Sequence, residues 1–436
     1  MCEIVTKRTI FVIWTGWVIV MLAYQVLVPA RLTLARPDRA LAWTATETTA
    51  GSQDGKIYLN EPFLNTHVSW DSEYYLAIAI GTYEDPNIHR VGGFSNVSSG
   101  GGFWPFIIPP SSGGVRQGIP LSYAFFPLYP FLIRLTSVPL SILGLNPIAT
   151  ATLAGVIISM LGTLAAMLAL YELALKNLGE NDGLRAAFYL IIFPSSFFLA
   201  EVYTEGLFVG LAFSSLMMLQ RGRRGWAAVL AVLATFTRAV GVALIVPLLI
   251  SWVREGEWLE LDLEWRQLYF KGLPWKAFGH ALVVFSPLLA FFLWRFSYYG
   301  MAFGKVEEEY FGRGLMNLGY TFVAWSEAVR SLFGSNPQAA AYYAVEIFAI
   351  LLGFTACIEG VRRYPELAWF GILVVFLSFT SGPAQGMHRY ILAAPPVFLF
   401  LSRLGRKTAF DRVWTLASIL VMGVMATMFM FDMWAG

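Results

Sequence analysis

The chain has 436 residues, of which 57% are apolar and only 13% charged, about half the roughly 25% charge of an average soluble domain. This composition excludes an ordinary cytosolic enzyme, because a soluble protein needs charged residues to cover its surface. The net charge of +2 offers no electrostatic basis for nucleic-acid binding, and two cysteines, Cys2 and Cys357, argue against a disulfide framework.

The predicted elements are membrane helices. Residues 10–28 follow Lys7 and Arg8 and are long enough to cross a bilayer, which takes roughly 20 apolar residues. No small-residue cleavage site follows them cleanly, so we expect a retained first helix with a cytoplasmic N-terminus. Stretches without Asp, Glu, Lys or Arg continue at 135–171, 206–220, 367–387 and 413–431. The sequence predicts an all-α polytopic bundle of about 9–11 membrane segments, forming a single domain over residues 1–436.

Basic residues cluster at 7–8, 176–185, 221–224, 254–276, 362–363 and 403–412, and the positive-inside rule places all these clusters on one side. This topology requires two segments that enter and leave the membrane on the same face. One is 123–143, interrupted by Pro127, Pro130 and Pro139, and the other is 226–253, broken around 237–241. Irregular backbone at membrane depth survives only where it is buried in protein or lines a polar cavity, so both breaks indicate a site.

Two long loops then lie on the outer face, at 29–120 and about 299–338. The first has about 90 residues, and loops of that length are normally functional or disordered. Residues 92–102 form a Gly/Ser-rich run with a glycosylation-type sequon at Asn96, whereas 67–80 mixes apolar and polar residues as a helix on a membrane surface would. We expect the loop 29–120 to carry membrane-surface helices and part of the active site.

Asp71 is the first candidate for chemistry. Helical spacing would place His67, Tyr74 and Tyr75 on its face, giving a carboxylate ringed by aromatic groups. Such a group could act as a general base or align a sugar hydroxyl stacked on Trp70 or a tyrosine. The alternative is a structural helix N-cap, with Asp71 accepting from the first free amides of the following helix.

Glu201 and Glu205 lie four residues apart between two predicted membrane spans. Two carboxylates at this spacing on one helical face repel, and they are costly near hydrocarbon unless they serve a purpose or reach water. One interpretation is a polar pocket at the outer end of the helix pair. The other is a tight turn in which both are solvated.

Arg238 lies near the middle of an apolar segment, and His388 and Arg389 lie between two spans on the outer side. A buried guanidinium needs a partner of opposite charge. A phosphate would suit Arg389, because a guanidinium can donate two hydrogen bonds to one phosphate. The alternative is internal pairing with a glutamate. Glu346 is likewise a charge within an apolar run, and the sequence offers no obvious partner for it. The run 307–309 is more typical of a solvated charged face.

Several segments together resemble the GPI mannosyltransferase II (PIG-V-like) family of GT-C membrane glycosyltransferases. They are the Trp-Asp segment at 70–79, Phe-Phe-Pro-Leu-Tyr-Pro at 125–130, the stretch from Phe-Pro-Ser-Ser to Tyr-Thr-Glu at 193–205, then Thr-Arg at 237–238 and Arg-Tyr at 389–390. The first two segments are fairly specific, whereas the last two pairs are not. The chain departs from the family at about 91–118, where a Gly/Ser- and Pro-rich insert stands.

The resemblance implies an inverting transfer of a mannose-type sugar from a polyprenyl- or dolichyl-phosphate donor to a lipid-linked acceptor, at an extracytoplasmic or lumenal site. Carried onto this chain, it makes Asp71 the base and Arg389, with Arg238 as second choice, the cations at the donor phosphate. Glu205 would line the substrate pocket. The remaining expected substrate contacts are Trp70, Tyr74, Tyr75, Glu201, Tyr203 and His388.

No phosphate-binding glycine loop, zinc spacing or nucleophile elbow is present, and a monophosphate donor leaves little for a metal to hold, so we expect no required cofactor and no metal site. The excess of Arg over Lys favours a prokaryotic cell membrane over the endoplasmic reticulum. The alternative function is a transporter or flippase for a lipid-linked sugar, in which broken helices would serve alternating access.

Overall fold

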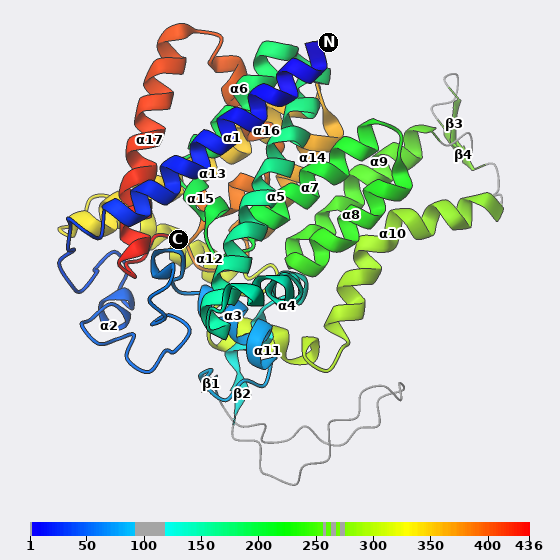
Figure 1. The fold of residues 1–436 in the computed structure, drawn as a ribbon. Helices are drawn as coiled ribbons and strands as arrows, with labels where there is room; N and C mark the ends of the chain where they lie inside the picture. Colours follow the sequence, from blue (N-terminus) through cyan, green and yellow to red (C-terminus); the bar gives the residue numbers. More distant parts are fainter. Residues whose placement is uncertain (1, 92–117, 256–258, 263–266, 271–274) are drawn as a thin grey trace.

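The computed structural model describes residues 2–91, 118–255, 259–262, 267–270 and 275–436 (Figure 1). The described residues form helices joined by turns and by longer irregular stretches such as 28–43 and 48–64, with two antiparallel pairs of short strands, β1 with β2 and β3 with β4. The predicted all-α membrane bundle is thereby confirmed.

The α-helices are α1 (Cys2–Leu27), α2 (Thr44–Glu47), α3 (Ser72–Gly81), α4 (Leu128–Leu140), α5 (Pro147–Leu178), α6 (Glu180–Ile192), α7 (Glu205–Gln220), α8 (Arg224–Thr237), α9 (Ile245–Glu255), α10 (Trp275–Arg295), α11 (Gly300–Glu309), α12 (Leu318–Ser331), α13 (Pro337–Gly360), α14 (Pro365–Phe379), α15 (Met387–Tyr390), α16 (Pro395–Leu404) and α17 (Thr408–Met430). The 3-10 turns are η1 (Asn65–His67), η2 (Leu121–Ala124), η3 (Ser141–Leu143), η4 (Ser196–Ala200), η5 (Ala239–Leu244) and η6 (Ile391–Ala393). The strands are β1 (Arg90–Val91), β2 (Ile119–Pro120), β3 (Leu259–Asp262) and β4 (Gln267–Phe270).

Four of the described helices are long and apolar enough to cross a membrane: Thr6–Leu27, Pro147–Leu178, Pro337–Gly360 and Thr408–Met430. A fifth candidate joins α10 to α11 through a bend of 81°. Further apolar helices, among them α7, α8, α14 and α16, have only 10–17 residues. The structure thus supports a membrane protein, but with fewer full-length spans than the 9–11 segments predicted, because several segments are interrupted.

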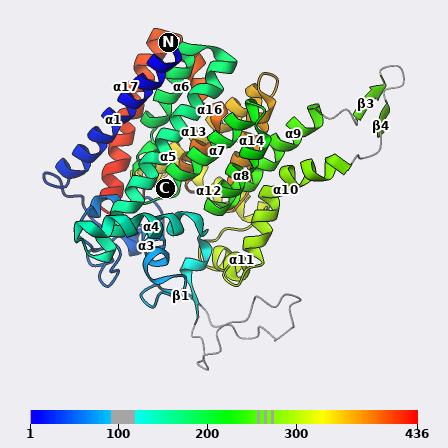
Figure 2. The same ribbon diagram turned by 45° about the vertical axis from the view of Figure 1, so that its right-hand side comes forward.

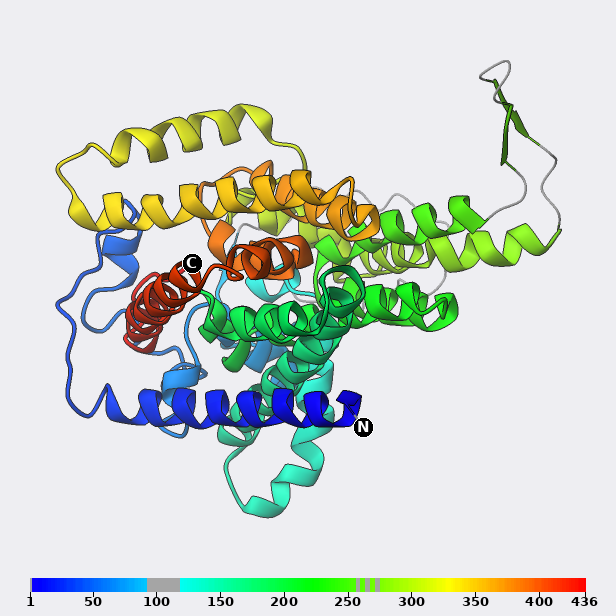
Figure 3. The same ribbon diagram turned by 90° about the horizontal axis from the view of Figure 1, so that it is seen from above.

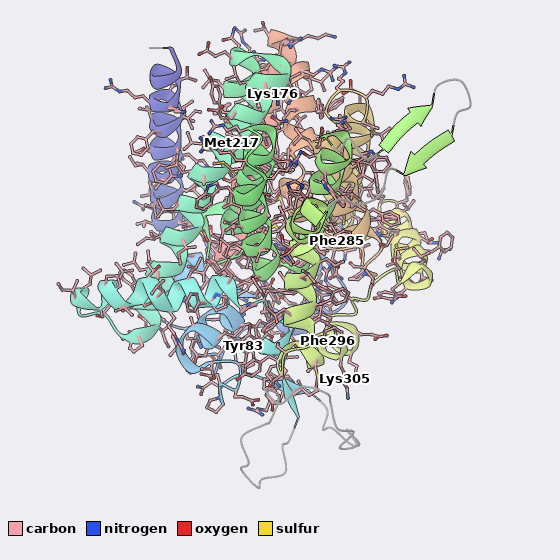
Figure 4. All side chains as sticks on the ribbon, turned by 90° about the vertical axis from the view of Figure 1, so that its right-hand side faces the viewer. Tyr83, Lys176, Met217, Phe285, Phe296 and Lys305 are labelled. Atoms are coloured by element: carbon pink, nitrogen blue, oxygen red, sulfur yellow. The ribbon has the colours of Figure 1, made fainter. Side chains whose placement is uncertain are left out.

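Both predicted breaks are present. After η2 the chain turns at Pro127 into α4, which runs across the direction of α5 rather than beside it (Figure 4). At the second break α8 ends at Thr237, Arg238 is extended, and η5 follows. The chain folds back there because Gly241 contacts the backbone of α8 at a point where any side chain would collide.

The described residues of the basic clusters lie at one end of the bundle, and the described parts of the two loops predicted to face outward lie at the other (Figure 4). Glu172 of α5 pairs with Lys7 at 3.8 Å and with Arg221 at 3.1 Å, which ties together the ends of α1, α5 and α7. Figure 4 shows Lys176 at this end and Tyr83 and Lys305 at the opposite end. The hairpin β3–β4 stands away from the helices (Figure 2).

The centre of the bundle is a close contact between α5 and α7. Gly162, Gly206 and Gly210 lie where added side chains would collide with the facing backbone, and small residues of this kind let membrane helices approach closely. Seen from above, α12 and α13 follow one edge of the molecule and α1 follows the opposite edge (Figure 3). The close contact fixes the start of α7, and with it the backbone of Glu205.

The outer loop differs from the expectation in one respect. Helix α3 does not lie on a surface: Ser72, Glu73 and five consecutive residues from Tyr75 to Ala79 are buried. Because this helix is apolar on most sides, it packs inside the protein against α4 and α5. The Gly/Ser-rich run and the sequon at Asn96 lie outside the described residues.

Candidate functional site

Four charged side chains form a continuous chain at the end of the bundle opposite the basic clusters. Arg389 Nη1 lies 3.4 Å from Asp71 Oδ2, and Arg389 Nε lies 3.1 Å from Glu205 Oε1. Glu205 Oε1 also pairs with Arg238 Nη1. The order is therefore Asp71, Arg389, Glu205, Arg238, with opposite charges adjacent throughout. Each buried charge has a partner, as burial in a membrane protein requires.

The two carboxylates differ in exposure. The Asp71 side chain is 27% exposed, whereas that of Glu205 is 3% exposed. Solvent therefore reaches part of the Asp71 side chain, while Glu205 is enclosed between two arginines. The exposure favours a chemical role for Asp71 and a charge-balancing role for Glu205.

Each charged residue lies where regular structure is interrupted. Asp71 immediately precedes α3, Glu205 is the first residue of α7, Arg238 occupies the extended break between α8 and η5, and Arg389 lies in the short helix α15. These interruptions leave room for side chains that straight apolar helices could not hold. The predicted link between broken segments and a polar site is thus found for Arg238.

Hydrogen bonds with Tyr203, two residues before α7, fix the backbone around Asp71. The Asp71 amide donates to Tyr203 Oη at 3.1 Å, and Tyr203 Oη donates to Ser69 O at 3.2 Å. Trp70 has φ of 51°, a left-handed conformation unusual for a bulky residue, and its indole donates to Met433 O at 3.3 Å. Strained backbone of this kind clusters at functional sites.

The Asp71 side chain does not cap α3, since it makes no hydrogen bond to the first amides of that helix. Asp71 thus occupies the N-cap position of α3 without the side-chain capping bond that the structural alternative expects. Burial raises the pKa of the Asp71 carboxyl above its ordinary value, and this effect outweighs the opposite influence of Arg389. A carboxylate with a raised pKa is a better proton acceptor than an ordinary one.

Glu346 finds its partner in the turn that carries Arg389. Its carboxylate accepts from the amides of Gly386 at 2.5 Å and Met387 at 2.7 Å, at the start of α15. The His388 ring lies 3.6 Å from the same carboxylate, so His388 faces Glu346 rather than Asp71. Glu346 therefore fixes the helical turn from which Arg389 extends.

Glu201 does not join this group. It is fully buried, pairs with His67 Nδ1 at 2.9 Å and accepts a hydrogen bond from Gln25 of α1. His67 is therefore turned toward Glu201 and does not share a face with Asp71 as expected. Glu201 and Glu205 do not lie on one helical face, because α7 begins only at Glu205. Neither residue is a solvated turn residue.

The tyrosines after Asp71 lie on different sides of α3. Tyr75 is buried, and its hydroxyl lies 3.4 Å from Thr204 Oγ1, next to Glu205. Tyr74 stacks on Phe125, with ring centroids 4.7 Å apart. Trp70 packs edge-on against Trp43 and Trp434.

Two residues at the site were missed by sequence reasoning. Tyr390 lies beneath three guanidinium groups: those of Arg238, Arg313 and Arg389 are 5.2, 5.3 and 5.3 Å from its ring centroid. Arg313 comes from the turn between α11 and α12, which no motif marks. The Arg-Tyr pair at 389–390 was the one available signal for Tyr390.

A pocket adjoins these residues. Glu205, Arg238, Arg389 and Tyr390 supply its polar lining, and its apolar lining includes Phe208, Val209, Val240 and Val374. A polar group beside an apolar wall suits an amphiphile. The enclosed volume of about 10 Å³ holds about one water molecule, so a larger ligand enters only when side chains move. Among the described residues, no group of three or more His, Cys, Asp or Glu could hold a metal ion.

The sequence profile of the mannosyltransferase (PIG-V) family matches residues 117–324, a little under half of the chain. The predicted family resemblance is thereby confirmed, and the match supports a glycosyltransferase. Glu205, Arg238 and Arg313 lie inside the matched range, whereas Asp71 and Arg389 lie outside it. No curated protein sequence matches the chain.

Solved structures similar to the chain include the oligosaccharyltransferase of Archaeoglobus fulgidus. Its apo form has 13% identity and a TM-score of 0.42, with 88% of this chain and 55% of the other covered. The form tethered with an acceptor peptide containing the NVT sequon has 14% identity and a TM-score of 0.41, with 88% and 54% covered. The complex with an inhibitory peptide and a dolichol-phosphate has 13% identity and a TM-score of 0.40, with 87% and 54% covered. The chain spans about half the length of these structures.

Proposed function

We propose that this chain, which resembles the mannosyltransferase (PIG-V) family over residues 117–324, is a membrane enzyme that transfers mannose from a polyprenyl-phosphate donor to a lipid-linked acceptor. The observation that carries the proposal is the chain of four charges in which the partly exposed carboxylate of Asp71 contacts a buried arginine, Arg389. A transfer from a lipid phosphate needs one base and one fixed cation close together.

In the proposed reaction the acceptor hydroxyl oxygen attacks C1 of the sugar, and its proton passes to the Asp71 carboxylate. The bond between C1 and the donor phosphate oxygen breaks, and its electron pair stays on that oxygen. Attack from the side opposite the phosphate inverts the configuration at C1. Arg389, with Arg238 beside it, counters the charge of the phosphate.

Donor binding exchanges one ion pair for another. Arg389 contacts Asp71 in the ligand-free chain, so a phosphate that binds Arg389 competes with Asp71 for it. Asp71 is then released toward the acceptor when the donor is in place. The apolar side of the adjacent pocket, with Phe208 and Val374, would receive the first part of the isoprenoid chain.

The proposal locates this reaction on the extracytoplasmic face of a cell membrane, with a prokaryotic membrane favoured over the endoplasmic reticulum. The site lies at the end of the bundle opposite the basic clusters, and the positive-inside rule assigns those clusters to the cytoplasm. The remaining expected contacts, Trp70, Tyr74, Tyr75, Tyr203 and Glu201, are proposed to shape or support the substrate pocket.

The test uses the purified full chain in proteoliposomes with polyprenyl-phosphate [³H]mannose and a membrane lipid extract of the source organism as acceptor pool. The proposal expects labelled glycolipid and an equal amount of polyprenyl phosphate. Movement of the labelled donor across the bilayer without a new glycosidic bond would instead identify a flippase and contradict the proposal.

A further inference from the structure

Arg313 is a third cation at the site and differs from the other two in its partners. Its guanidinium donates only weakly, to Ser381 Oγ at 3.3 Å and to the carbonyl of Gln385 at 3.4 Å. None of the ion pairs among the described residues includes Arg313. Glu307, near the end of α11, acts on Arg313 electrostatically but forms no ion pair with it. Arg238 and Arg389, by contrast, both pair with Glu205.

The turn that carries Arg313 is firmly held. The Arg313 amide donates to Glu307 O at 2.8 Å, the Gly314 amide to Ser381 O at 2.7 Å, and the Asn317 amide to Thr380 O at 2.9 Å. The first bond ties the turn to the end of α11, and the other two attach it to the segment after α14, which leads directly into α15 and Arg389. Arg313 and Arg389 therefore have a fixed relative position, and the guanidinium of each lies 5.3 Å from the centroid of the Tyr390 ring.

The charge of Arg313 matches the charge that the donor phosphate gains during transfer. Asp71 and Glu205 form ion pairs with Arg238 and Arg389, whereas Arg313 has no carboxylate within ion-pair distance among the described residues, and the more distant Glu307 acts on its charge. A polyprenyl-phosphate sugar is a phosphodiester with one negative charge. When the bond from C1 to phosphate oxygen breaks, the phosphate becomes a monoester and gains close to one further charge.

We infer that Arg313 binds the leaving phosphate and stabilises the charge that develops on it during transfer. This inference rests on the proposed function, because it takes a sugar-bearing lipid phosphate as the substrate. Arg313 contributes little to the singly charged donor and most to the doubly charged product. Interactions that strengthen along the reaction raise its rate, whereas those equal in donor and transition state do not.

The experiment compares binding of polyprenyl phosphate and polyprenyl-phosphate mannose to the full chain by calorimetry. Arg313→Ala should weaken polyprenyl phosphate binding about 10- to 100-fold, the usual range for loss of a hydrogen bond between charged groups, and change donor binding less than about 3-fold. Arg389→Ala should weaken both. Arg330→Ala, an exposed arginine of the adjacent helix α12, is the matched control and should change neither.

Arg313→Lys keeps the charge and should recover part of the product affinity, which separates a charge effect from damage to the turn. Equal loss of affinity for donor and product, or no loss for either, would overturn the inference. Because binding requires no acceptor, its outcome is independent of the transfer assay. The wild-type chain could form no mannosyl product while Arg313→Ala still weakens binding of polyprenyl phosphate more than binding of the donor. That result would contradict the proposed function but support the phosphate site.

Discussion

The guanidinium of Arg389 lies 3.4 Å from the carboxylate of Asp71, although the two residues are 318 positions apart in the chain. One precedes the buried helix α3 of the first outer loop, and the other lies on the turn between α14 and α16. Their contact brings the proposed base and the proposed phosphate ligand into one site.

The first prediction concerns pH. Asp71 must be ionised to accept a proton, and burial raises its pKa above the ordinary value. Activity should therefore fall as the pH is lowered through this raised pKa, at a higher pH than for an unperturbed aspartate, whose pKa is about 3.9. The profile of kcat/KM for the donor against pH measures this limb. An acid limb at or below the ordinary aspartate value would contradict the assignment.

The second prediction concerns Glu205. Glu205→Gln leaves Arg238 and Arg389 without their shared carboxylate, and loss of one partner of a buried ion pair costs about 3–5 kcal/mol of unfolding free energy. A phosphate ligand should replace part of the missing charge. Thermal unfolding should therefore show a larger stabilisation by polyprenyl phosphate in this variant than in wild type.

The matched control for this experiment is Glu201→Gln. Glu201 is equally buried, but it pairs with His67 and Gln25, away from the arginines. This variant should also lose stability, while its stabilisation by polyprenyl phosphate should equal that of wild type. An equal ligand response in both variants would show that Glu205 does not hold the phosphate-binding arginines.

The third prediction concerns Glu346 as a positioning residue for Arg389. Glu346→Ala removes the acceptor of the Gly386 and Met387 amides, which should cost about 1–3 kcal/mol of stability for each group left unpaired. The loosened turn should raise the KM for the donor more than it lowers kcat. Glu346→Gln keeps one acceptor oxygen but sets its NH2 against the other backbone amide, so it should recover only part of the donor affinity. An unchanged donor KM in Glu346→Ala would exclude the positioning role.

The fourth prediction concerns Glu73, which lies beside the site on α3 and is 8% exposed. Burial raises its pKa to about 7. Because the folded chain holds this proton more tightly than the unfolded chain, stability is greatest below the unfolded pKa of about 4.3 and declines as pH rises toward 7.

Glu73→Gln should accordingly stabilise the protein at pH 8, by up to about 3 kcal/mol, and have little effect at pH 4. Unfolding in mild detergent at both pH values measures the difference. The exposed Glu327→Gln on α12 serves as the control and should show no pH-dependent gain. A gain of equal size at both pH values would contradict the stated cause.

Much of the fold follows from the sequence. Charge-free stretches predicted the apolar helices, and interruptions such as that at 237–241 predicted the irregular backbone that carries Arg238. The sequence predicted about 9–11 membrane segments, two of them broken, and the described apolar helices comprise four or five of spanning length and shorter ones such as α7, α8 and α14. The surface position predicted for α3 was wrong because other helices cover it.

The site was predicted less completely. Scarcity of charge identified Asp71, Glu205, Arg238 and Arg389, since an uncompensated charge in an apolar protein is costly. Which carboxylate meets which arginine depends on tertiary contacts, so Glu201 was grouped with Glu205 although it faces α1. The role of Arg313 could not be predicted, because it lies in a loop of ordinary composition. Only the folded chain places it beside Tyr390.

The most direct test of the proposed active site is single-turnover transfer from polyprenyl-phosphate [³H]mannose by Asp71→Asn, with Asp432→Asn, a neighbouring carboxylate that accepts from Ser69, as the control. The account predicts that Asp71→Asn lowers the transfer rate at least about 100-fold, as expected for loss of a general base, while the donor still binds. Asp432→Asn should transfer mannose at nearly the wild-type rate. Undiminished transfer by Asp71→Asn would contradict the central claim.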